Sequence, residues 1–333
     1  MGSNIKEIAT LAGVSRSTAS RVISGKGYAS PEVRERVMAV VEKLQYKPSA
    51  VARAMVNQRT HNIGVIVFRE QQPIVSHPLY GKLIDSILAA SEACGYSVFL
   101  KTDQEMSLRS TDYLLEQRVD GLILISRFRK NVIDHVKKFG VPYLMVNGTT
   151  DDPDVIQLVS DDEEGGASAA AHLHRLGHRR FLVIAGPQEH RSHNLRLEGF
   201  LRGLGGFGPS VDCEVVLSSD STFDQGRRLM SRHAEEFLRA GRTALFATND
   251  MLALGAMRTL LGLSVRVPEQ VAVMGFDDIG PAAMYTPALS TVRVDTDRIG
   301  KDAVAMLDRI IRGEKDLPKL NVYASELIVR QST

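Results

Sequence analysis

Residues 4–27 read NIKEIATLAGVSRSTASRVISGKG, and this stretch decides the fold of the N-terminal region. Asn4 and Glu7 have the spacing of a capping box, and apolar residues follow at helical spacing until Gly13 breaks the helix. Ser15 is a suitable N-cap for a second helix, which ends at Gly25. Two short helices joined by a glycine turn predict a helix-turn-helix.

The second helix has one apolar face and one outward face without an acidic residue. The outward face carries small hydroxyl side chains and arginines: Arg16, Ser17, Thr18, Ser20 and Arg21. Arginine can donate two hydrogen bonds to the edge of guanine, and serine and threonine reach bases or phosphates. Ser30-Pro31-Glu32 has the pattern that begins a third helix. The pattern therefore predicts a three-helix DNA-binding domain.

The charge distribution supports this prediction. Residues 1–60 hold ten basic and four acidic side chains, a formal charge of +6, whereas the remaining residues hold 31 basic and 35 acidic side chains. A basic head on a mildly acidic body is typical of a polyanion-binding module joined to a second domain.

Composition excludes several protein classes. The 44% hydrophobic and 24% charged residues are ordinary for a globular protein, which argues against disordered and fibrous chains. Two cysteines make no disulfide framework, residues 1–25 lack the apolar core of a secretory signal, and no apolar run is long enough to span a membrane. We therefore expect a cytoplasmic protein with no membrane partner.

Beyond residue 62 the pattern changes to apolar runs separated by helical stretches. The runs that we expect to be strands are Ile63–Phe68, Tyr96–Leu100, Leu122–Ile125, Tyr143–Val146, Phe181–Ala185, Ala244–Ala247 and Val271–Phe276. The helical stretches include Tyr80–Ala93, Gly165–Leu176 and Met251–Leu261. Continuous apolar strands that alternate with helices predict parallel sheets covered on both faces, and their number suggests two such sheets.

The N-terminal motif resembles the signature of the lac repressor/galactose repressor (LacI/GalR) family. The matching residues are Ile5-Lys6-Glu7-Ile8-Ala9, Ala12-Gly13-Val14-Ser15, Thr18-Ala19-Ser20-Arg21-Val22 and the later Tyr46-Lys47-Pro48-Ser49-Ala50-Val51-Ala52-Arg53. The resemblance continues through Arg196-Leu197-Glu198-Gly199-Phe200, Asn249-Asp250 and Gly275-Phe276-Asp277-Asp278. It implies an N-terminal all-α helix-turn-helix domain followed by an α/β two-lobed periplasmic-binding-protein-like effector domain.

The resemblance also implies domain boundaries. The helix-turn-helix domain spans 1–48, a hinge helix and linker span 49–61, and the effector-binding and dimerisation domain spans 62–333. Lobe 1 takes about 62–160 and 292–320, and lobe 2 takes about 161–291 and 321–333.

The family resemblance assigns roles to residues that contact DNA. Arg16 and Ser17 match the positions that select the operator, Arg21 matches the arginine at the far end of the recognition helix, and Ser15 and Thr18 match phosphate-facing positions. The hinge helix matches residues 49–56, and its expected DNA-contacting residues are Ser49, Ala52, Arg53 and Met55. Met55 stands where the family usually has a leucine that wedges into the minor groove, a role that an apolar, flexible methionine can take.

The same resemblance assigns an effector pocket between the lobes. Asn147, Arg196, Asn249 and Asp277 match residues that bind sugar hydroxyls. The expected walls and neighbours are Phe68, Tyr80, His193 and Phe223, the last because Ser221 occupies a position where the family often has an aromatic residue. Amide, carboxylate and guanidinium groups suit a polyol. The basic stretch from His190 to Arg196 leaves open whether the effector is a neutral sugar or a phosphorylated or acidic one.

Together with these patterns, the resemblance implies a homodimeric transcription regulator, expected to be a repressor of carbohydrate-use genes, that binds a near-palindromic double-stranded operator and a small sugar-like effector. Two other classes fit less well. A transporter's sugar receptor fits the sheet region alone but not the helix-turn-helix. A doubly wound enzyme needs a nucleotide loop or a catalytic constellation, and the sequence has neither, so we expect no enzyme activity, cofactor or metal.

Overall fold

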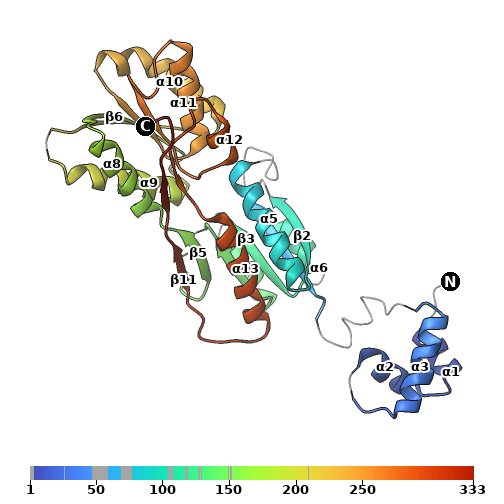
Figure 1. Cartoon of the computed structure of the whole chain (residues 1–333). Coiled ribbons are helices and arrows are strands. Elements are labelled where there is room, and N and C mark those ends of the chain that lie inside the picture. The colour runs from blue at the N-terminus through green and yellow to red at the C-terminus, as the bar shows by residue number, and fades with distance from the viewer. Residues whose placement is uncertain are drawn as a thin grey trace. The chain divides into compact units, whose positions relative to one another are not determined.

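The computed structural model describes residues 4–333 except 26, 47–58, 69–76, 104–107, 117–118, 127, 129, 149, 151 and 209. The chain forms two compact units, Met1–His61 and Asn62–Thr333, whose elements are labelled in Figure 1. The predicted hinge helix, with Ser49, Ala52, Arg53 and Met55, lies outside the described residues, which resume at positions 59–61 of the predicted linker. Its boundaries therefore stay a prediction.

The N-terminal unit contains the three predicted helices, α1 (Ile5–Leu11), α2 (Arg16–Ser24) and α3 (Pro31–Lys43). The Asn4 side chain accepts hydrogen bonds from the backbone N–H groups of Lys6 and Glu7, so it caps α1 as the sequence predicts. Ser15 and Ser30 cap α2 and α3 in the same way, and Gly25 ends α2 in the left-handed conformation. The apolar faces of the three helices pack together around Ile8, Ala19, Val22 and Val37.

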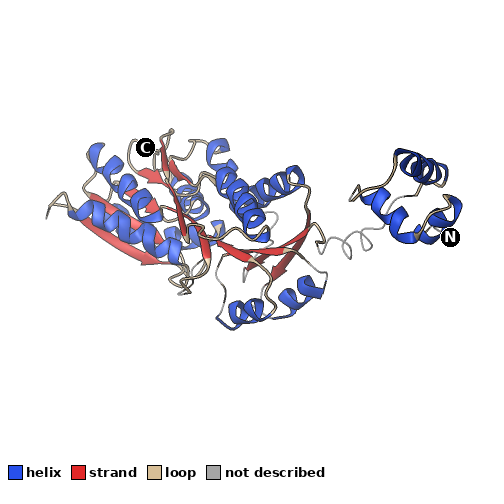
Figure 2. Ribbon diagram, turned by 90° about the horizontal axis from the view of Figure 1, so that it is seen from below, coloured by secondary structure: helices blue, strands red, loops and turns tan. Residues whose placement is uncertain are grey.

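The first lobe of the second unit is built on a parallel six-stranded sheet in the order β11-β5-β4-β3-β1-β2. Its strands are β1 (Asn62–Phe68), β2 (Ser97–Asp103), β3 (Gly121–Ile125), β4 (Tyr143–Val146), β5 (Ile156–Ser160) and β11 (Leu320–Tyr323). The helices of this lobe are α5 (Pro78–Ala93), α6 (Leu108–Glu116), α7 (Lys130–Lys138) and α13 (Thr296–Ile311). Figure 2 shows helices on both faces of the sheet, which confirms the predicted doubly wound arrangement.

The second lobe is built on a parallel four-stranded sheet in the order β7-β6-β8-β9. Its strands are β6 (Arg180–Ala185), β7 (Asp212–Leu217), β8 (Ala244–Ala247) and β9 (Ala272–Met274). Its helices are α8 (Asp162–Arg175), α9 (Arg191–Gly205), α10 (Phe223–Arg239), α11 (Asp250–Gly262) and the short α12 (Gly280–Met284). The acidic residues at the start of α8 lie where the helix dipole favours negative charge, and Asp161 caps the helix.

The chain passes between the two sheets three times. The later passages carry β10 (Thr291–Arg293) and β12 (Glu326–Ile328), which pair antiparallel as a separate two-stranded ribbon. The sequence placed the last change of lobe at about residue 320, but β11 pairs with β5 from Leu320 to Tyr323. The first lobe therefore extends at least three residues further than predicted, because Leu320–Tyr323 completes its sheet edge by backbone hydrogen bonding.

Side chains on each central strand alternate between two apolar cores. On β1, Ile63, Val65 and Val67 belong to one cluster, and Ile66 and Phe68 belong to another on the opposite face. This alternation follows from the two-residue period of a strand. Because both faces are covered by helices, every one of these positions is apolar, and the sequence does not distinguish the two faces.

The helices of the second lobe pack in two close pairs held together by glycines. A Cβ on Gly166 would lie 2.2 Å from the backbone oxygen of Arg196, so α8 and α9 approach there only because Gly166 has no side chain. A Cβ on Gly255 would likewise collide with the backbone oxygen of Phe223, so the absence of a side chain there lets α11 approach α10. The N-terminal ends of α9, α10 and α11 in these pairs contribute to the second-lobe side of the cavity between the lobes.

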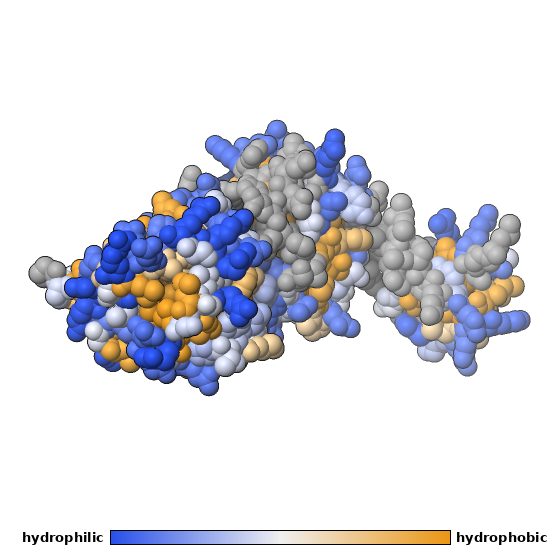
Figure 3. Space-filling model, turned by 90° about the horizontal axis from the view of Figure 1, so that it is seen from above, coloured by the Kyte–Doolittle hydropathy of each residue, from blue (hydrophilic) through white to orange (hydrophobic). Residues whose placement is uncertain are grey.

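The surface of the second unit mixes charged and apolar side chains. On the face seen in Figure 3, apolar side chains gather over part of the second lobe within a rim of hydrophilic ones. In the described parts of the chain, no helix has both the length and the apolar character needed to span a bilayer.

Candidate DNA-binding surface and effector pocket

The predicted DNA-contacting residues of α2 share one exposed side of that helix. Ser15, Arg16, Ser17 and Arg21 are exposed and Thr18 is half-buried, whereas Ala19 and Val22 on the other side are buried. The side-chain oxygen of Ser15 accepts a hydrogen bond from the Thr18 N–H, and it lies 2.8 Å from the hydroxyl oxygens of both Ser17 and Thr18. Three hydroxyls therefore gather at the N-terminus of α2, where backbone N–H groups and the helix dipole favour an anion such as phosphate.

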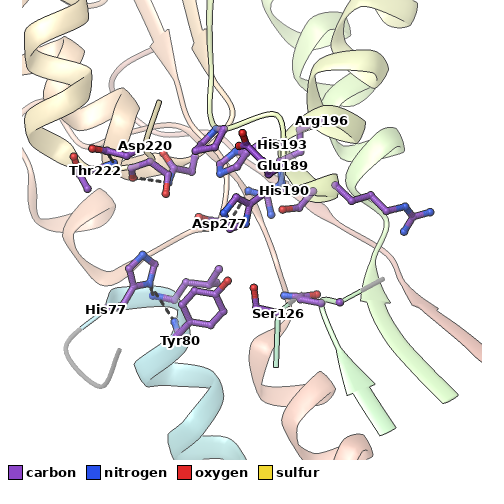
Figure 4. A pocket seen from close by; sticks show the side chains of 18 of the residues that line it. His77, Tyr80, Ser126, Glu189, His190, His193, Arg196, Asp220, Thr222 and Asp277 are labelled. Carbon is purple, nitrogen blue, oxygen red and sulfur yellow. Dashed lines mark hydrogen bonds and ion pairs between the residues drawn. The ribbon is translucent and has the colours of Figure 1, made fainter. Parts of the chain in front are cut away.

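A cavity of about 270 Å³ lies between the two lobes of the second unit (Figure 4). Its volume is near the lower end of the range of about 300–1,000 Å³ found for small-molecule sites. The first lobe contributes His77, Leu79, Tyr80, Ser126, Asn147 and Gly148. The second lobe contributes residues 187 and 189–193, Arg196, residues 219–222, Asn249 and Asp277. A ligand of small size fits this space and would be contacted from both lobes.

Arg196 lines this cavity and belongs to a buried charged cluster. Its Nε donates to Asp162 Oδ1 and its Nη1 donates to Asp277 Oδ1, each at 2.8 Å, and Nη1 also donates to the backbone oxygen of Thr248. The guanidinium carbon lies 3.9 Å from the ring centroid of Phe276. Burial disfavours the charge, but the two carboxylates raise the pKa of Arg196 above its ordinary value, so the guanidinium stays charged.

Thr248 orients a second lining residue, His193. The Thr248 hydroxyl oxygen accepts a hydrogen bond from the Gly186 N–H and lies 2.8 Å from Nδ1 of the buried His193 ring. A Cβ on Gly186 would lie 2.6 Å from three atoms of that ring, so the ring rests directly on the glycine. The Thr248 hydroxyl and the Gly186 backbone therefore fix the position of the His193 ring.

In the described part of the chain, four helices begin at the cavity, and their N-cap residues line it. These residues are His77 of α5, His190 of α9, Thr222 of α10 and Asn249 of α11. Asn249 uses its side-chain oxygen to accept from the Leu252 N–H and its nitrogen to donate to the backbone oxygen of Ser221. The Nδ1 atom of His77 accepts from the N–H groups of Leu79 and Tyr80, which leaves Nε2 as the N–H donor of that ring.

Two polar side chains of the first lobe line the cavity without making a hydrogen bond to another described residue. Ser126 follows β3 and Asn147 follows β4, and both adopt left-handed backbone conformations, with φ of 77° and 49°. Such conformations are uncommon for residues with a side chain and often occur at functional sites. The Ser126 hydroxyl and the Asn147 amide are therefore available to bind a ligand.

The structure brings six of the predicted effector residues together around this cavity: Tyr80, Asn147, His193, Arg196, Asn249 and Asp277. Phe68 and Phe223 do not line it, so their predicted places in the pocket wall were wrong. Phe68 is 2% exposed in the core on the far face of β1, where its ring packs edge-on against Phe128. Phe223 is the first residue of α10, and its side chain packs against the core of the second lobe.

Several lining residues were missed from the sequence. His77 and Thr222 could have been found as cap residues, since each directly precedes a predictable helix start, and Ser126 directly follows an apolar strand. Asp220 and Glu189 carry no such local signal. No group of histidine, cysteine, aspartate or glutamate side chains within the described ranges is arranged to hold a metal ion.

Asp250, next to Asn249, carries a buried carboxyl group whose pKa is strongly shifted by its surroundings. Its two oxygens accept hydrogen bonds from the Ile279 N–H and from the Thr291 hydroxyl. Burial, together with the nearby charge of Asp277, raises the pKa of Asp250 well above its ordinary value. When folding raises the pKa of a carboxyl, the folded protein holds that proton more tightly than the unfolded chain does. The resulting contribution to the free energy of unfolding is fully present below the pKa of the unfolded chain and is lost as the pH rises.

We therefore expect Asp250→Asn to change how stability depends on pH. The stability of the natural protein relative to the variant should fall as the pH rises above about 4, by up to about 1.4 kcal/mol per pH unit while only the unfolded chain ionises. Urea unfolding between pH 4 and 8 measures this difference, and Asp85→Asn, which removes an exposed carboxylate, serves as the control. A difference that stays constant over this range would contradict the assignment.

Comparison with known proteins supports the predicted identity of both the N-terminal helices and the two-lobed unit. Residues 4–49 match the family described as bacterial regulatory proteins, lacI family, and residues 170–333 match the periplasmic binding protein-like domain. The HTH-type transcriptional regulator CelR of Thermobifida fusca is 33% identical over 98% of this chain and 97% of its own length. This chain belongs to the LacI family.

Solved structures of the family have the same fold as this LacI-family protein. The lac repressor dimer bound to operator and the anti-inducer ONPF has a TM-score of 0.85 and 26% identity, covering 100% of this chain and 99% of that one. A complex of the transcriptional regulator CelR with cellobiose has a TM-score of 0.74 and 30% identity, covering 99% and 100% of the two chains. The predicted fold class and family are confirmed, and this LacI-family protein is a transcriptional regulator with a helix-turn-helix domain.

Proposed function

We propose that this protein represses carbohydrate-use genes as a homodimer on a near-palindromic operator, and that a small sugar-like effector bound between its lobes switches its operator affinity. The observation that carries the proposal is a cavity lined by hydrogen-bonding side chains from both lobes in the same chain as a helix-turn-helix. Structures of similar proteins support it, since they include a dimer on operator DNA and a regulator with cellobiose. We propose that the protein acts in the cytoplasm, where operator DNA is accessible to it.

The two-lobed site suits a switch. A ligand that touches both lobes has a binding free energy that depends on how the lobes are arranged, so it favours one arrangement over another. Couplings of this kind are typically worth about 1–3 kcal/mol. Because the family consists of transcriptional regulators, we propose that the ligand is bound and released without chemical change.

The charges around the cavity favour a neutral polyol over a sugar phosphate or sugar acid. The positive charge of Arg196 is already matched by Asp162 and Asp277, and Glu189 and Asp220 add further negative charge. The second arginine of the lining, Arg191, is exposed. An anionic effector would therefore lose its hydration on binding without meeting a buried guanidinium that is free to pair with it. Such uncompensated desolvation of a charge costs binding free energy.

A thermal-shift measurement on the full-length protein tests this proposal with matched pairs such as glucose against glucose 6-phosphate and galactose against galacturonate. We expect neutral sugars to raise Tm, because a ligand at about a hundred times its Kd adds about 2.7 kcal/mol to the stability.

Removing the Asn147 side chain with Asn147→Gly, which keeps the left-handed backbone, should reduce the shift by weakening binding. Asp316→Gly is the matched control, since Asp316 has φ of 62° in an exposed loop. A shift with the anionic partner of a pair and none with the neutral one would contradict the charge argument.

A further inference from the structure

Gly27, just beyond the end of α2, lies directly against the side chain of Arg21. A Cβ placed on Gly27 would lie 2.7 Å from Cδ of Arg21, closer than real Cβ contacts, and 3.0 Å from its Cγ, so the Arg21 side chain would have to shift. The φ of Gly27 is +86°, in the region that favours glycine. The aliphatic stem of Arg21 therefore occupies the space that any other residue at position 27 would fill.

Gly25 provides an internal comparison two residues away. It also has a left-handed backbone, with φ of +67°, but a Cβ there would meet nothing within 4 Å. Its conformation ends α2, where its N–H donates to the backbone oxygen of Val22. Gly25 is thus needed for the backbone turn alone, whereas Gly27 also leaves space for Arg21.

The Arg21 guanidinium makes no hydrogen bond or ion pair with another described residue, and the side chain is exposed. Its direction is therefore set by how its stem packs. An arginine that reads a base must hold both donor groups toward the guanine edge, so a displaced stem weakens the contact even though the charge remains.

We propose that Gly27 is a positioning residue for DNA recognition, because it holds the Arg21 stem in the orientation from which the guanidinium reaches its base. The proposal rests on the proposed role of Arg21 in operator binding. It distinguishes Gly27 from Gly25, which has the same kind of backbone but no contact with Arg21.

Selection of DNA duplexes from a random library by the full-length protein, followed by sequencing, tests the proposal and requires no known operator. The natural protein is compared with Gly27→Ala, Gly25→Ala and Arg21→Ala. We expect Arg21→Ala to remove the base preference at certain positions of the selected duplexes. At the same positions, Gly27→Ala should reduce the preference for the favoured base about tenfold. Gly25→Ala has a comparable backbone strain and should change discrimination there by less than about twofold. Affinity for random duplexes at low salt should be similar for the two glycine variants, since both keep the Arg21 charge.

The possible failures are separable. If Arg21→Ala leaves the base preferences unchanged, the proposed role of Arg21 is wrong and the positioning proposal falls with it. If Arg21→Ala flattens certain positions and Gly27→Ala does not, Arg21 reads DNA without help from Gly27. Equal loss in Gly27→Ala and Gly25→Ala would assign the effect to backbone strain and would also overturn the proposal.

Discussion

Replacing Arg21 with alanine is expected to remove operator preference while leaving the fold of both units intact. Arg21 is exposed at the end of α2 and its side chain has no hydrogen bond or ion pair with another described residue. Its loss therefore costs the folded protein little. Each arginine–guanine contact is worth about 1–3 kcal/mol of discrimination, and a homodimer makes two, so we expect a loss of about 2–6 kcal/mol.

Gel-shift titrations measure this loss on the duplex that the natural protein selects from a random library. Arg36→Ala is the matched control, because Arg36 is an exposed arginine of α3 and its removal takes the same charge from the same domain. We expect that variant to keep its operator preference and to weaken binding to all duplexes by a similar, small factor. Operator affinity within twofold of the natural protein for Arg21→Ala would falsify the assignment of α2 as the recognition helix.

The second large effect is expected at Arg196. Arg196→Ala leaves Asp162 and Asp277 buried, at 6% and 5% exposure, without their cation. Removing one partner of a buried ion pair typically costs about 3–5 kcal/mol. Since small domains are stable by only about 5–15 kcal/mol, this is a large share of the stability of the second lobe.

Urea unfolding of the natural protein and the variant measures this cost. Arg293→Ala is the control, because Arg293 also pairs with two carboxylates, those of Asp278 and Glu326, but its side chain is 40% exposed. Exposed pairs contribute about 0–1 kcal/mol, so the two arginines should differ several-fold in their effect. If Arg196→Ala does not fold, Arg196→Lys keeps the charge without spanning both carboxylates and should show an intermediate loss.

A loss below about 1 kcal/mol at pH 7 for Arg196→Ala would show that the buried cluster is not held together by Arg196.

Local signals predicted the N-terminal unit well. Asn4, Ser15 and Ser30 cap the three helices as expected, because a cap depends on hydrogen bonds within three residues of itself. Apolar runs likewise located most strands of the two sheets, with β4 and β8 beginning and ending where predicted, but β5, β7 and β11 were not among the expected strands. These features need only the neighbouring sequence.

The direction of side chains on buried strands was less predictable. Phe68 ends a strand that is apolar on both faces, so its pattern offers no reason to choose between the cavity side and the opposite core. Ser126 and Asn147 line the cavity through left-handed backbone conformations that neither residue type signals by itself. The register of the sheet and the turns after its strands decided these positions.

The sequence alone determined the family, the helix-turn-helix and its exposed recognition face, because these depend on short-range patterns and on motif spacing. Only the tertiary structure decided what the basic stretch around Arg196 does. Asp162 and Asp277 are 34 and 81 residues away along the chain, and folding brings both to within 2.8 Å of the Arg196 guanidinium. Because the two carboxylates balance that charge, we propose that the site favours a neutral ligand, a choice that the sequence left open.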